Sequence, residues 1–396
     1  MDKVSVSFWQ DIGMTKQVTS KFDITIIGGG IAGLSCAYWL LKEDKGLRVA
    51  LVEKNQIGAG ASGRNAGFIT CGSVEHFNRL VSTHGESQAL EIWNFSETNL
   101  MLLKSELLSV NPEECDFEQK GSFSLASTEQ EYQELKQTYV CMQKLNIEVE
   151  QLNQSEIKKC LGVDHFVGGI KYIKDAAINP MKLLQKLKKS LLLNYNFSLY
   201  ENHEVFDIQT QGDSKVVKAN NNYLSSSAVI MATNGYLPLF DDYFKDKIFP
   251  TKGQILTTTS VPQFMLGPCY ANFVLDYFRQ LKGGEIIIGG FRQLEKLTQV
   301  GYSDEISPVI QQALEQFLAK HLPILKQSQI THRWSGVMGF SVDGQPLIGS
   351  LPTDNQVFFL GGFTAHGLGL AFHSAKCLVD LIYGRETPAF ISAKRF

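Results

Sequence analysis

The stretch "IIGGGIAGL", residues 26–34, carries three glycines in the spacing Gly28, Gly30 and Gly33. A short β-branched run, "DITII", precedes it, and the apolar spacing of "AGLSCAYWLLKE" after it is typical of a helix. The next segment, "LRVALVEK", predicts a second strand. Strand, glycine turn, helix and strand form a βαβ unit, so we expect an α/β fold that contains a parallel sheet.

This glycine spacing meets the physical demands of a dinucleotide-binding turn. Gly28 permits the tight turn out of the strand, Gly30 lets the backbone approach a pyrophosphate, and Gly33 lets the helix pack closely on the sheet. The phosphates then lie at the helix N-terminus, beside Ile31 and Ala32, where free N–H groups and the helix dipole favour anions.

Glu53 ends the second predicted strand, twenty positions after Gly33. A carboxylate at this place accepts hydrogen bonds from a ribose hydroxyl, so we assign Glu53 and the adjacent Lys54 to the cofactor site. The turn alone does not choose between NAD and FAD, because both present an ADP half with a free ribose diol.

A second loop of small residues, "IGAGASGRNAGF", covers residues 57–68 and lies at the same edge of the sheet. It places few side chains between backbone and ligand, through Gly58, Gly60, Ala61, Ser62 and Gly63. This favours a cofactor whose ring continues past its phosphates against main chain, which a nicotinamide enzyme does not need. A plain flexible loop is the alternative.

The C-terminal stretch "FLGGFTAHGLGLAFHSAKCL" is a second place where glycines precede a predicted helix. Its glycines flank two polar residues ahead of an apolar helix: Gly361, Gly362, Thr364, His366, Gly367 and Gly369. A helix N-terminus there directs partial positive charge at a bound group. A reduced flavin carries negative charge at N1 and is a suitable partner.

The composition of the 396-residue chain excludes several classes of protein. Lys and Arg number 37 against 40 Asp and Glu, a net charge of -3, so no nucleic-acid partner is indicated. Seven scattered cysteines form no Cys-x-x-Cys pair, which indicates no metal site and fits a reducing cytoplasm. No segment reaches the ~18 apolar residues of a membrane span. We expect a cytoplasmic protein, with peripheral membrane contact left open.

The pattern of predicted elements indicates a discontinuous architecture. Helices are expected at residues 128–145, after Asn179 with Pro180 at the first helical position, and at 307–322. The strands "GQILTTT", "NFVLDYFRQ" and "GGEIIIGGF" look antiparallel. We predict a polar leader at 1–20, a Rossmann-like cofactor domain from 21–82, 178–238 and 330–396, and an inserted antiparallel substrate domain from 83–177 and 239–329.

These segments together resemble the D-amino-acid-oxidase-like family of FAD-dependent oxidoreductases. The resemblance covers nearly the whole chain, from "SFWQD" through "GGGIAGL", "VEKNQIGAGASGRNAGF", "VIMATNGY", "PTKGQIL" and "RWSG…DGQPLIG" to "GGFTAHGLG". Within it, "GAGASGRNAG" is most similar to the branch that contains γ-glutamylputrescine oxidoreductase.

The resemblance implies bound FAD and oxidation of a C–N bond at a CH-NH or CH-NH2 donor. A hydride equivalent moves to flavin N5, the imine is hydrolysed, and oxygen or another acceptor reoxidises the flavin. The implied substrate is a small amine or amino-acid derivative, such as a γ-glutamyl-polyamine-like compound. Alternatives are a dehydrogenase of this fold that passes electrons to a quinone or partner protein, and a non-catalytic flavin-binding module.

The resemblance also extends the set of cofactor-binding residues. In the family pattern, Glu53 binds the adenosine ribose and Val205 contacts the adenine region. The residues along the flavin and near its pyrimidine end are Ser62, Gly63, Asn65, Ala66, Gly67, Thr233, Gly362, Thr364, His366, Gly367 and Leu368. Related oxidases carry a substrate-binding arginine where this chain has Met338, and a flavin-linking cysteine near Val337. We therefore expect non-covalent FAD and doubt a simple α-amino acid held at position 338.

The chemistry belongs mainly to the flavin, so the catalytic candidates are few. His366 is the best candidate for a polar group beside the ring, against a purely structural role in the turn. Arg64 and Asn65 contact flavin or substrate, or lie at the surface. Tyr277, Arg279 and Arg292 lie on the antiparallel strands, where either arginine pairs with a distant carboxylate or faces solvent.

Overall fold

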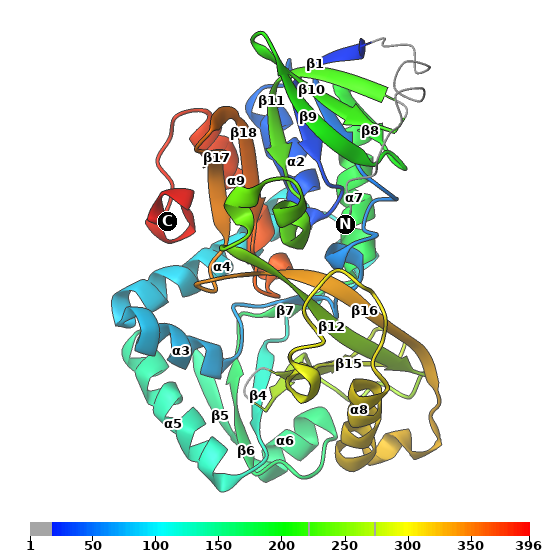
Figure 1. Ribbon diagram of the computed structural model, residues 1–396. Coiled ribbons are helices and arrows are strands. Elements are labelled where there is room, and N and C mark those ends of the chain that lie inside the picture. Colours follow the sequence, from blue (N-terminus) through cyan, green and yellow to red (C-terminus); the bar gives the residue numbers. More distant parts are fainter. Residues whose placement is uncertain (1–17, 221, 273–274) are drawn as a thin grey trace. The chain divides into compact units, whose positions relative to one another are not determined.

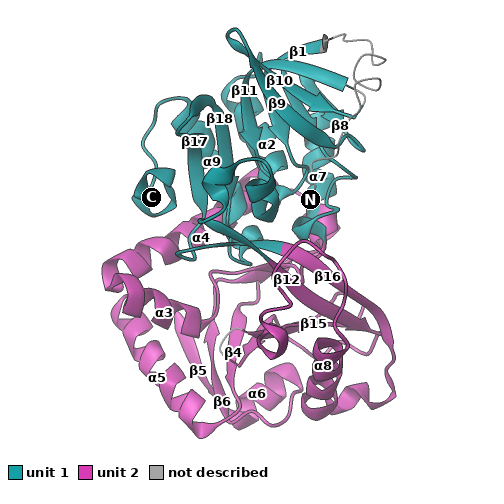
Figure 2. Cartoon of the chain, in the orientation of Figure 1, with its two compact units in different colours: residues 1–63, 183–250, 338–396 teal, residues 64–182, 251–337 magenta. Residues whose placement is uncertain are grey.

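The structure is a computed structural model that describes residues 18–220, 222–272 and 275–396. Two compact units divide the chain, as Figure 2 shows in two colours: unit 1 comprises residues 1–63, 183–250 and 338–396, and unit 2 comprises 64–182 and 251–337. Each unit is therefore built from separate chain segments. The leader predicted at 1–20 lies, up to residue 17, outside the described residues.

The sheet of unit 1 is mainly parallel, as the βαβ pattern predicts. Strand β1 pairs in parallel with β2 on one side and β11 on the other. Strands β8 and β18 continue the parallel sheet, and β17 joins antiparallel at the edge. The order is β17 (Leu347–Leu351), β18 (Asp354–Gly361), β11 (Asn222–Met231), β1 (Val18–Ile27), β2 (Val49–Val52) and β8 (Phe197–Tyr200). Figure 1 labels these strands except β2.

An antiparallel ribbon and three helices complete this part of the chain. Strands β9 (Val205–Gln211) and β10 (Ser214–Ala219) extend from β11. Helix α2 (Ile31–Glu43) contacts α9 (Gly367–Ile382), where Trp39 Nε1 donates to the Phe372 carbonyl over 2.9 Å. Helix α7 (Pro180–Leu192) begins as predicted, since the Asn179 side chain accepts from the Lys182 N–H.

The large sheet of unit 2 is predominantly antiparallel. Its order is β16 (Ile330–Ser341), β12 (Ile248–Thr258), β15 (Ile286–Gly289), β14 (Asp276–Gln280), β13 (Cys269–Ala271), β4 (Ser122–Ala126), β6 (Gly168–Tyr172) and β5 (Val149–Asn153). The three predicted middle strands pair antiparallel, whereas β13 and β4 run parallel. Of the strand predicted over residues 272–280, β14 covers Asp276–Gln280, Asn272 has a left-handed φ of 47°, and Phe273 and Val274 lie outside the described residues.

Helices surround this sheet. They are α3 (Val74–His84), α4 (Glu86–Glu106), α5 (Glu129–Lys144), α6 (Gln154–Leu161) and α8 (Pro308–His321). The helix predicted at 128–145 is α5, which begins with a capping box of Thr128 and Glu131, and the one at 307–322 is α8, capped by Ser307. A two-stranded sheet of β3 (Phe68–Ile69) and β7 (Ala176–Ala177) lies directly after the second small-residue loop.

Short 3-10 turns connect the elements: η1 (Ala61–Gly63), η2 (Pro112–Cys115), η3 (Asn234–Leu239), η4 (Asp242–Phe244), η5 (Arg292–Glu295), η6 (Pro323–Gln327), η7 (Ala389–Ile391) and η8 (Ala393–Arg395). Among the helices of the described ranges, none is long and apolar enough to span a bilayer. Five of the seven cysteines are buried, where a thiol packs as a small apolar group.

Candidate functional site

The turn between β1 and α2 has no room for side chains. Gly28 has a φ of 111°, and a Cβ atom on it would lie 2.7 Å from the Ala232 carbonyl oxygen. A Cβ atom on Gly33 would lie 1.9 Å from the Gly28 carbonyl oxygen. Glycine at these positions lets strand, turn and helix pack directly on one another and leaves backbone facing the outside of the turn.

The N-terminus of α2 is available to an anion. Gly30 occupies the N-cap and offers no side-chain cap, and the first turn holds no acidic residue. The Ile31 N–H donates to Ser62 Oγ over 2.9 Å, so the second small-residue loop supplies one hydrogen-bond acceptor to this end. The N–H groups of the first turn, including those of Ala32 and Gly33, have no acceptor within the helix itself. This arrangement suits a pyrophosphate.

Thr233 provides a second indication of a ligand in the same unit. Its Oγ1 atom is buried and has no hydrogen-bond partner among the described residues. Its Cγ2 atom would lie 3.5 Å from a Cβ atom on Gly28, so the hydroxyl belongs to the surroundings of the glycine turn. A buried hydroxyl without a protein partner is expected to bond to water or a ligand, and Thr233 is among the predicted cofactor residues.

Glu53 is held rigidly beside this turn. Its Oε2 atom accepts from the Gly29 N–H over 2.6 Å, and its Oε1 atom accepts from the Asn55 N–H over 2.9 Å. A carboxylate has further lone pairs, so it can still accept from ribose hydroxyls. The neighbouring Lys54 forms an ion pair with Glu204 over 2.7 Å. Val205 begins β9 and packs against the core cluster of unit 1.

The C-terminal glycine turn is held by a residue that the sequence did not single out. Asn234 Oδ1 accepts from the Gly362 N–H over 3.0 Å, and Gly362 has a φ of 70°. Thr364 Oγ1 accepts from the Ser341 N–H over 3.2 Å. Thr364 and Ala365 both have left-handed backbone, with φ of 46° and 67°. Asn234 follows the predicted cofactor residue Thr233 in "ATNG", and this position is the feature of the sequence that could have indicated its role.

His366 is the N-cap residue of α9, ahead of Gly367 and the buried Leu368. Its Nδ1 atom lies 2.8 Å from the Thr364 carbonyl oxygen. Because a carbonyl only accepts, Nδ1 carries a hydrogen and donates this hydrogen bond. The first turn of α9 holds no acidic residue, so this helix end also carries partial positive charge.

In unit 2, the segment after Arg64 is fixed by its own backbone and by a buried arginine. Asn65 Oδ1 accepts from the Gly67 N–H over 2.8 Å. Arg279 donates from Nε to the Ala66 carbonyl over 2.6 Å and from Nη2 to the Ile178 carbonyl over 2.8 Å. Gly67 has a φ of 77°, and a Cβ atom on it would lie 2.1 Å from the Ile178 carbonyl oxygen.

The position of Arg279 corrects its predicted solvent-facing role. Its side chain is 6% exposed, and desolvation lowers its pKa to about 10, while the nearby carboxylates of Glu118 and Asp116 act in the opposite direction. The strand alternation turns Arg279 toward the Ala66 carbonyl, where it pairs with backbone rather than with a carboxylate. Sequence reasoning did not find this internal role.

Tyr277 and Arg292 interact electrostatically in the same unit. Tyr277 packs against a small cluster that contains Ala66, and its ring lies 5.8 Å from that of Phe68. Desolvation raises the pKa of Tyr277 to about 12, and the charge of Arg292 opposes this shift. Desolvation also lowers the pKa of Arg292. The two side chains thus share a partly dehydrated environment.

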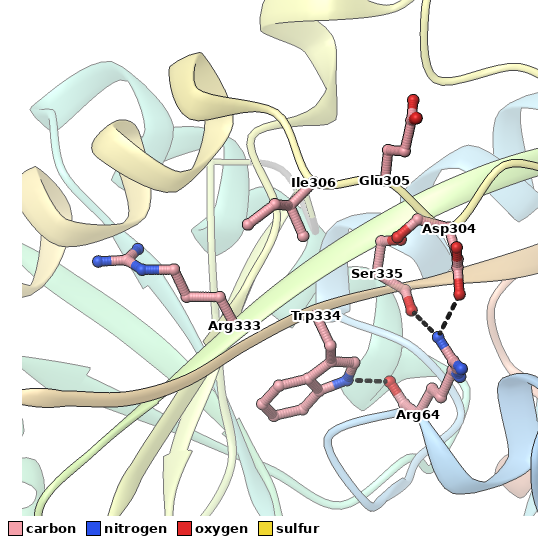
Figure 3. Close-up of a pocket in the computed structure, with 7 residues that line it drawn as sticks. All are labelled: Arg64, Asp304, Glu305, Ile306, Arg333, Trp334 and Ser335. Carbon is pink, nitrogen blue, oxygen red and sulfur yellow. Dashed lines mark hydrogen bonds and ion pairs between the residues drawn. The ribbon is translucent and has the colours of Figure 1, made fainter.

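Arg64 lines a pocket of about 640 Å³ within unit 2, shown in Figure 3. Its Nη1 atom donates to the Ser335 carbonyl over 2.9 Å and lies 3.4 Å from Asp304 Oδ2. The Trp334 indole N–H donates to the Arg64 carbonyl over 2.9 Å. The pocket is lined by Arg64, Asp304, Glu305, Ile306, Arg333, Trp334 and Ser335.

The predicted site residues therefore form two groups, one in each unit. Unit 1 holds Gly28, Gly30, Ile31, Ala32, Gly33, Glu53, Lys54, Ala61, Ser62, Gly63, Val205, Thr233, Gly362, Thr364, His366, Gly367 and Leu368, and unit 2 holds Arg64, Asn65, Ala66, Gly67, Tyr277 and Arg292. Unit 1 combines the glycine turn, the N-terminus of α2 without a capping side chain at Gly30, and the fixed carboxylate of Glu53. These are the features of a dinucleotide-binding protein.

Comparison with known families narrows this class. A family model described as "FAD dependent oxidoreductase" (DAO) matches residues 23–381. The chain belongs to this family, and its cofactor is FAD. The residues of unit 1 fit that group, because the open helix end, the buried Thr233 hydroxyl and the fixed Glu53 carboxylate suit an adenine dinucleotide.

Curated relatives match along most of their length. A probable oxidoreductase OrdL from Haemophilus influenzae is 25% identical over 380 residues, covering 92% of this chain and 83% of the relative. Gamma-glutamylputrescine oxidoreductase from Escherichia coli is 23% identical, covering 91% and 84%. Glycine oxidase from Geobacillus kaustophilus is 24% identical, covering 93% and 95%.

Solved structures confirm the fold class. The crystal structure of glycine oxidase from Geobacillus kaustophilus superimposes with a TM-score of 0.79 at 23% identity, covering 94% of this chain and 97% of that one. L-proline dehydrogenase from P. horikoshii superimposes with a TM-score of 0.77 at 20% identity, covering 94% and 96%. At these identities the likeness establishes the mixed α/β fold.

Proposed function

We propose that the protein oxidises a C–N bond in an amine or amino-acid derivative, using non-covalent FAD. The observation that carries the proposal is the family match over residues 23–381, which includes both glycine turns. Relatives named for oxidation of glycine and of gamma-glutamylputrescine support the substrate class. FAD, when bound, supplies the two-electron acceptor for the carbon–nitrogen bond.

The residues of unit 1 have separate roles in this proposal. The N–H groups at the start of α2 bind the pyrophosphate, and Glu53 accepts from the adenosine ribose. Val205 lies at the adenine region, and the Thr233 hydroxyl bonds to the cofactor. Residues 364–368 present the N-terminus of α9, whose partial positive charge favours a reduced, anionic flavin.

We propose further that unit 1 is the cofactor domain and unit 2 the substrate domain. The chain passes from one compact unit to the other at 63/64, 182/183, 250/251 and 337/338. The corresponding domain borders predicted from the sequence follow residues 82, 177, 238 and 329. The loop 61–67 spans the first of these borders. Ser62 accepts a hydrogen bond from the Ile31 N–H of α2 in unit 1, and Asn65, Ala66 and Gly67 belong to unit 2. This loop is proposed to lie along the flavin.

His366 is proposed to contact the flavin or substrate, because it is the N-cap residue of α9 and follows the C-terminal glycine turn. Tyr277 and Arg292 are proposed to line the substrate side, where their partial dehydration strengthens polar contacts with a ligand. The substrate amine reacts in its neutral form, so these side chains orient it and exclude water without a dedicated base.

A second candidate is a dehydrogenase that passes electrons to a quinone or a partner protein. The fold supports it because L-proline dehydrogenase from P. horikoshii shares the architecture with a TM-score of 0.77. The two candidates differ only in the acceptor. A γ-glutamyl-polyamine-like compound is the proposed substrate of either, because a relative named for gamma-glutamylputrescine covers 91% of the chain.

An absorbance experiment tests the function. Purified protein is expected to be yellow and to release its flavin on acid precipitation. Anaerobic addition of amines and amino acids is expected to bleach the flavin band, and readmitted air that yields peroxide identifies an oxidase. Bleaching without peroxide, reversed by a quinone, identifies the dehydrogenase. A yellow protein that no C–N compound bleaches identifies a flavin-binding module and defeats the proposal.

A further inference from the structure

One end of unit 1 carries an exposed apolar turn, which joins α7 to β8 (Figure 1). Leu192, Leu193 and Tyr195 in this turn are 52%, 89% and 93% exposed. Leu187 and Leu191, by contrast, are buried and belong to the core-facing side of α7. The chain thus leaves the buried face of the helix and places three large apolar side chains in water within four positions. Single exposed apolar residues are common, whereas a contiguous group of them indicates a contact with another surface.

A second turn beside it brings positive charge. Residues 44–48 join α2 to β2, and the Asn196 side chain donates from Nδ2 to the Lys45 carbonyl over 2.8 Å, so the two turns are neighbours. Lys45 is exposed, as are Lys189 in the last turn of α7 and Lys21 near the start of β1. Within the described ranges, no carboxylate forms an ion pair with any of these three lysines. The three cations on this edge are therefore available to an anion.

The acidic groups near these turns are mostly paired. Asp23 forms an ion pair with Arg48 at 2.7 Å, and Glu43 forms one with Arg385. Asp44 is exposed and has no ion pair with a cation of the described residues. Three lysines thus stand against one carboxylate. This end of unit 1 has a local excess of positive charge, although the whole chain carries a net charge of -3.

The size and chemistry of this surface favour a lipid partner over a protein. A stable dimer or complex takes roughly 20–30 residues from each side, whereas this surface offers three apolar side chains and three lysines on and beside two short turns. A bilayer needs less, because a few inserted apolar side chains and nearby cations hold a peripheral protein on anionic lipid. Tyrosine is also typical of the boundary between membrane and water.

We propose that this end of unit 1 docks on an anionic lipid surface. Leu193 and Tyr195 enter the interfacial layer of the bilayer, Leu192 contacts its margin, and the lysines bind the phosphate groups of the lipid heads. The surface lies at the amino end of the parallel strands, whereas the glycine turn follows the carboxyl end of β1. The 13 residues of α2 separate the two by about 20 Å. Docking therefore leaves the dinucleotide turn away from the lipid, and it does not depend on which reaction the protein catalyses.

Sedimentation with lipid vesicles tests the docking surface. The full-length holoprotein is mixed with vesicles of phosphatidylcholine alone, or of phosphatidylcholine with the anionic lipid phosphatidylglycerol. It is expected to sediment with the mixed vesicles and to bind the neutral ones at least about tenfold more weakly, because the lysines find no anionic partner there. Added salt is expected to weaken the binding to the mixed vesicles, since it screens the contacts of exposed charges.

A substitution in the apolar turn shows whether this surface makes the contact. Leu193→Ser is expected to lower the affinity for the mixed vesicles at least about tenfold, because the apolar layer loses an inserted side chain. Leu297→Ser is the matched control. Leu297 is 90% exposed in unit 2 and follows Glu295 and Lys296, whose charges cancel. This control is expected to change the affinity less than about twofold.

The charged residues provide a second comparison. Lys45→Gln and Lys189→Gln are each expected to lower the affinity for the mixed vesicles about fivefold. Lys326→Gln removes an exposed lysine from η6 in unit 2 and is expected to change this affinity less than about twofold. Asp44→Asn removes the unpaired carboxylate and is expected to raise the affinity several-fold, opposite in sign to the two lysine variants.

A second copy of the chain as the occupant of this surface gives a different result. The protein would then self-associate in analytical ultracentrifugation without vesicles, and Leu193→Ser would abolish this association. That outcome overturns the proposal. Equal binding to neutral and mixed vesicles, binding to neither, and equal losses in Leu193→Ser and Leu297→Ser each overturn it as well.

Discussion

The guanidinium of Arg279 binds the carbonyl oxygen of Ala66 over 2.6 Å and so ties strand β14 to the segment that follows Arg64. Arg279→Met keeps the length of the side chain but leaves the buried carbonyls of Ala66 and Ile178 without their donor. We expect a loss of about 3 kcal/mol in the free energy of unfolding, because hydrogen bonds to charged groups each contribute about 1.5–3 kcal/mol. Urea denaturation measures it.

The exposed pair of Arg48 and Asp23, at 2.7 Å, provides the matched control. Arg48→Met is expected to lower the free energy of unfolding much less than Arg279→Met does, since an exposed ion pair is screened by water. Equal losses in the two variants would show that the burial of Arg279 is not the cause.

Gly33→Ala places a methyl group 1.9 Å from the Gly28 carbonyl oxygen. The turn must then open, so the N-terminus of α2 moves from its position and the protein is expected to lose FAD binding and several kcal/mol of stability. Gly46→Ala, in the turn after α2, is the control, because its added methyl meets only the Asp44 side chain, at 3.1 Å. Flavin fluorescence titration of the apoproteins measures both, and retained FAD affinity in Gly33→Ala would contradict the assignment of this turn.

Ala365 has a φ of 67°, a conformation that costs an L-residue roughly 1 kcal/mol. Ala365→Gly is therefore expected to raise stability by up to about 1 kcal/mol, although glycine substitutions usually destabilise. Ala371→Gly, in the interior of α9, is expected to do the opposite by about 1 kcal/mol or more. Thermal unfolding with equal signs in the two variants would refute this explanation.

Asp175 gives unit 2 a specific pH dependence. Its carboxyl is 1% exposed, and burial raises its pKa to about 8, although it accepts from Ser122 Oγ over 2.6 Å and from the Cys71 N–H. The unfolded chain loses this proton near pH 4 and the folded one only near pH 8. The unfolded state thus binds fewer protons between these values, and stability falls as the pH rises through this range.

Asp175→Asn is expected to remove that slope. The amide keeps the shape of the protonated acid and has no charge to bury, so the variant is expected to gain stability relative to wild type at pH 8 and to match it near pH 4. Denaturation curves at several pH values measure the difference. A wild type and variant with parallel pH profiles would mean that Asp175 ionises normally in the fold.

The fold was predictable wherever a local pattern determines structure. Gly28, Gly30 and Gly33 defined the βαβ unit, and Thr128 and Ser307 marked helix starts by their capping side chains. These signals act over a few residues, so they can be read along the chain. The parallel pairing of β13 with β4 could not be read this way, because it joins Cys269 to Phe123 and depends on how distant segments meet.

The site was predictable only in part for the same reason. Glu53 and Ser62 belong to the βαβ unit and to the loop after it, so their contacts with Gly29 and Ile31, across 24 and 31 positions, accompany a motif that the sequence makes recognisable. Arg279 reaches Ala66 across more than two hundred positions, and nothing in its neighbourhood along the chain marks a buried partner. Its role emerges only when β14 is placed beside that loop.

The interleaved course of the chain determines when the protein can fold during synthesis. Strand β1 is made before the other strands of its sheet, yet its neighbour β11 and then β18 follow only after much of unit 2 has been made. Until then one edge of β1 has no partner strand and is open to aggregation. Neither unit is a continuous fragment, so neither can be produced by simple truncation, and β1 has partner strands on both edges only once β11, which ends at Met231, has been made.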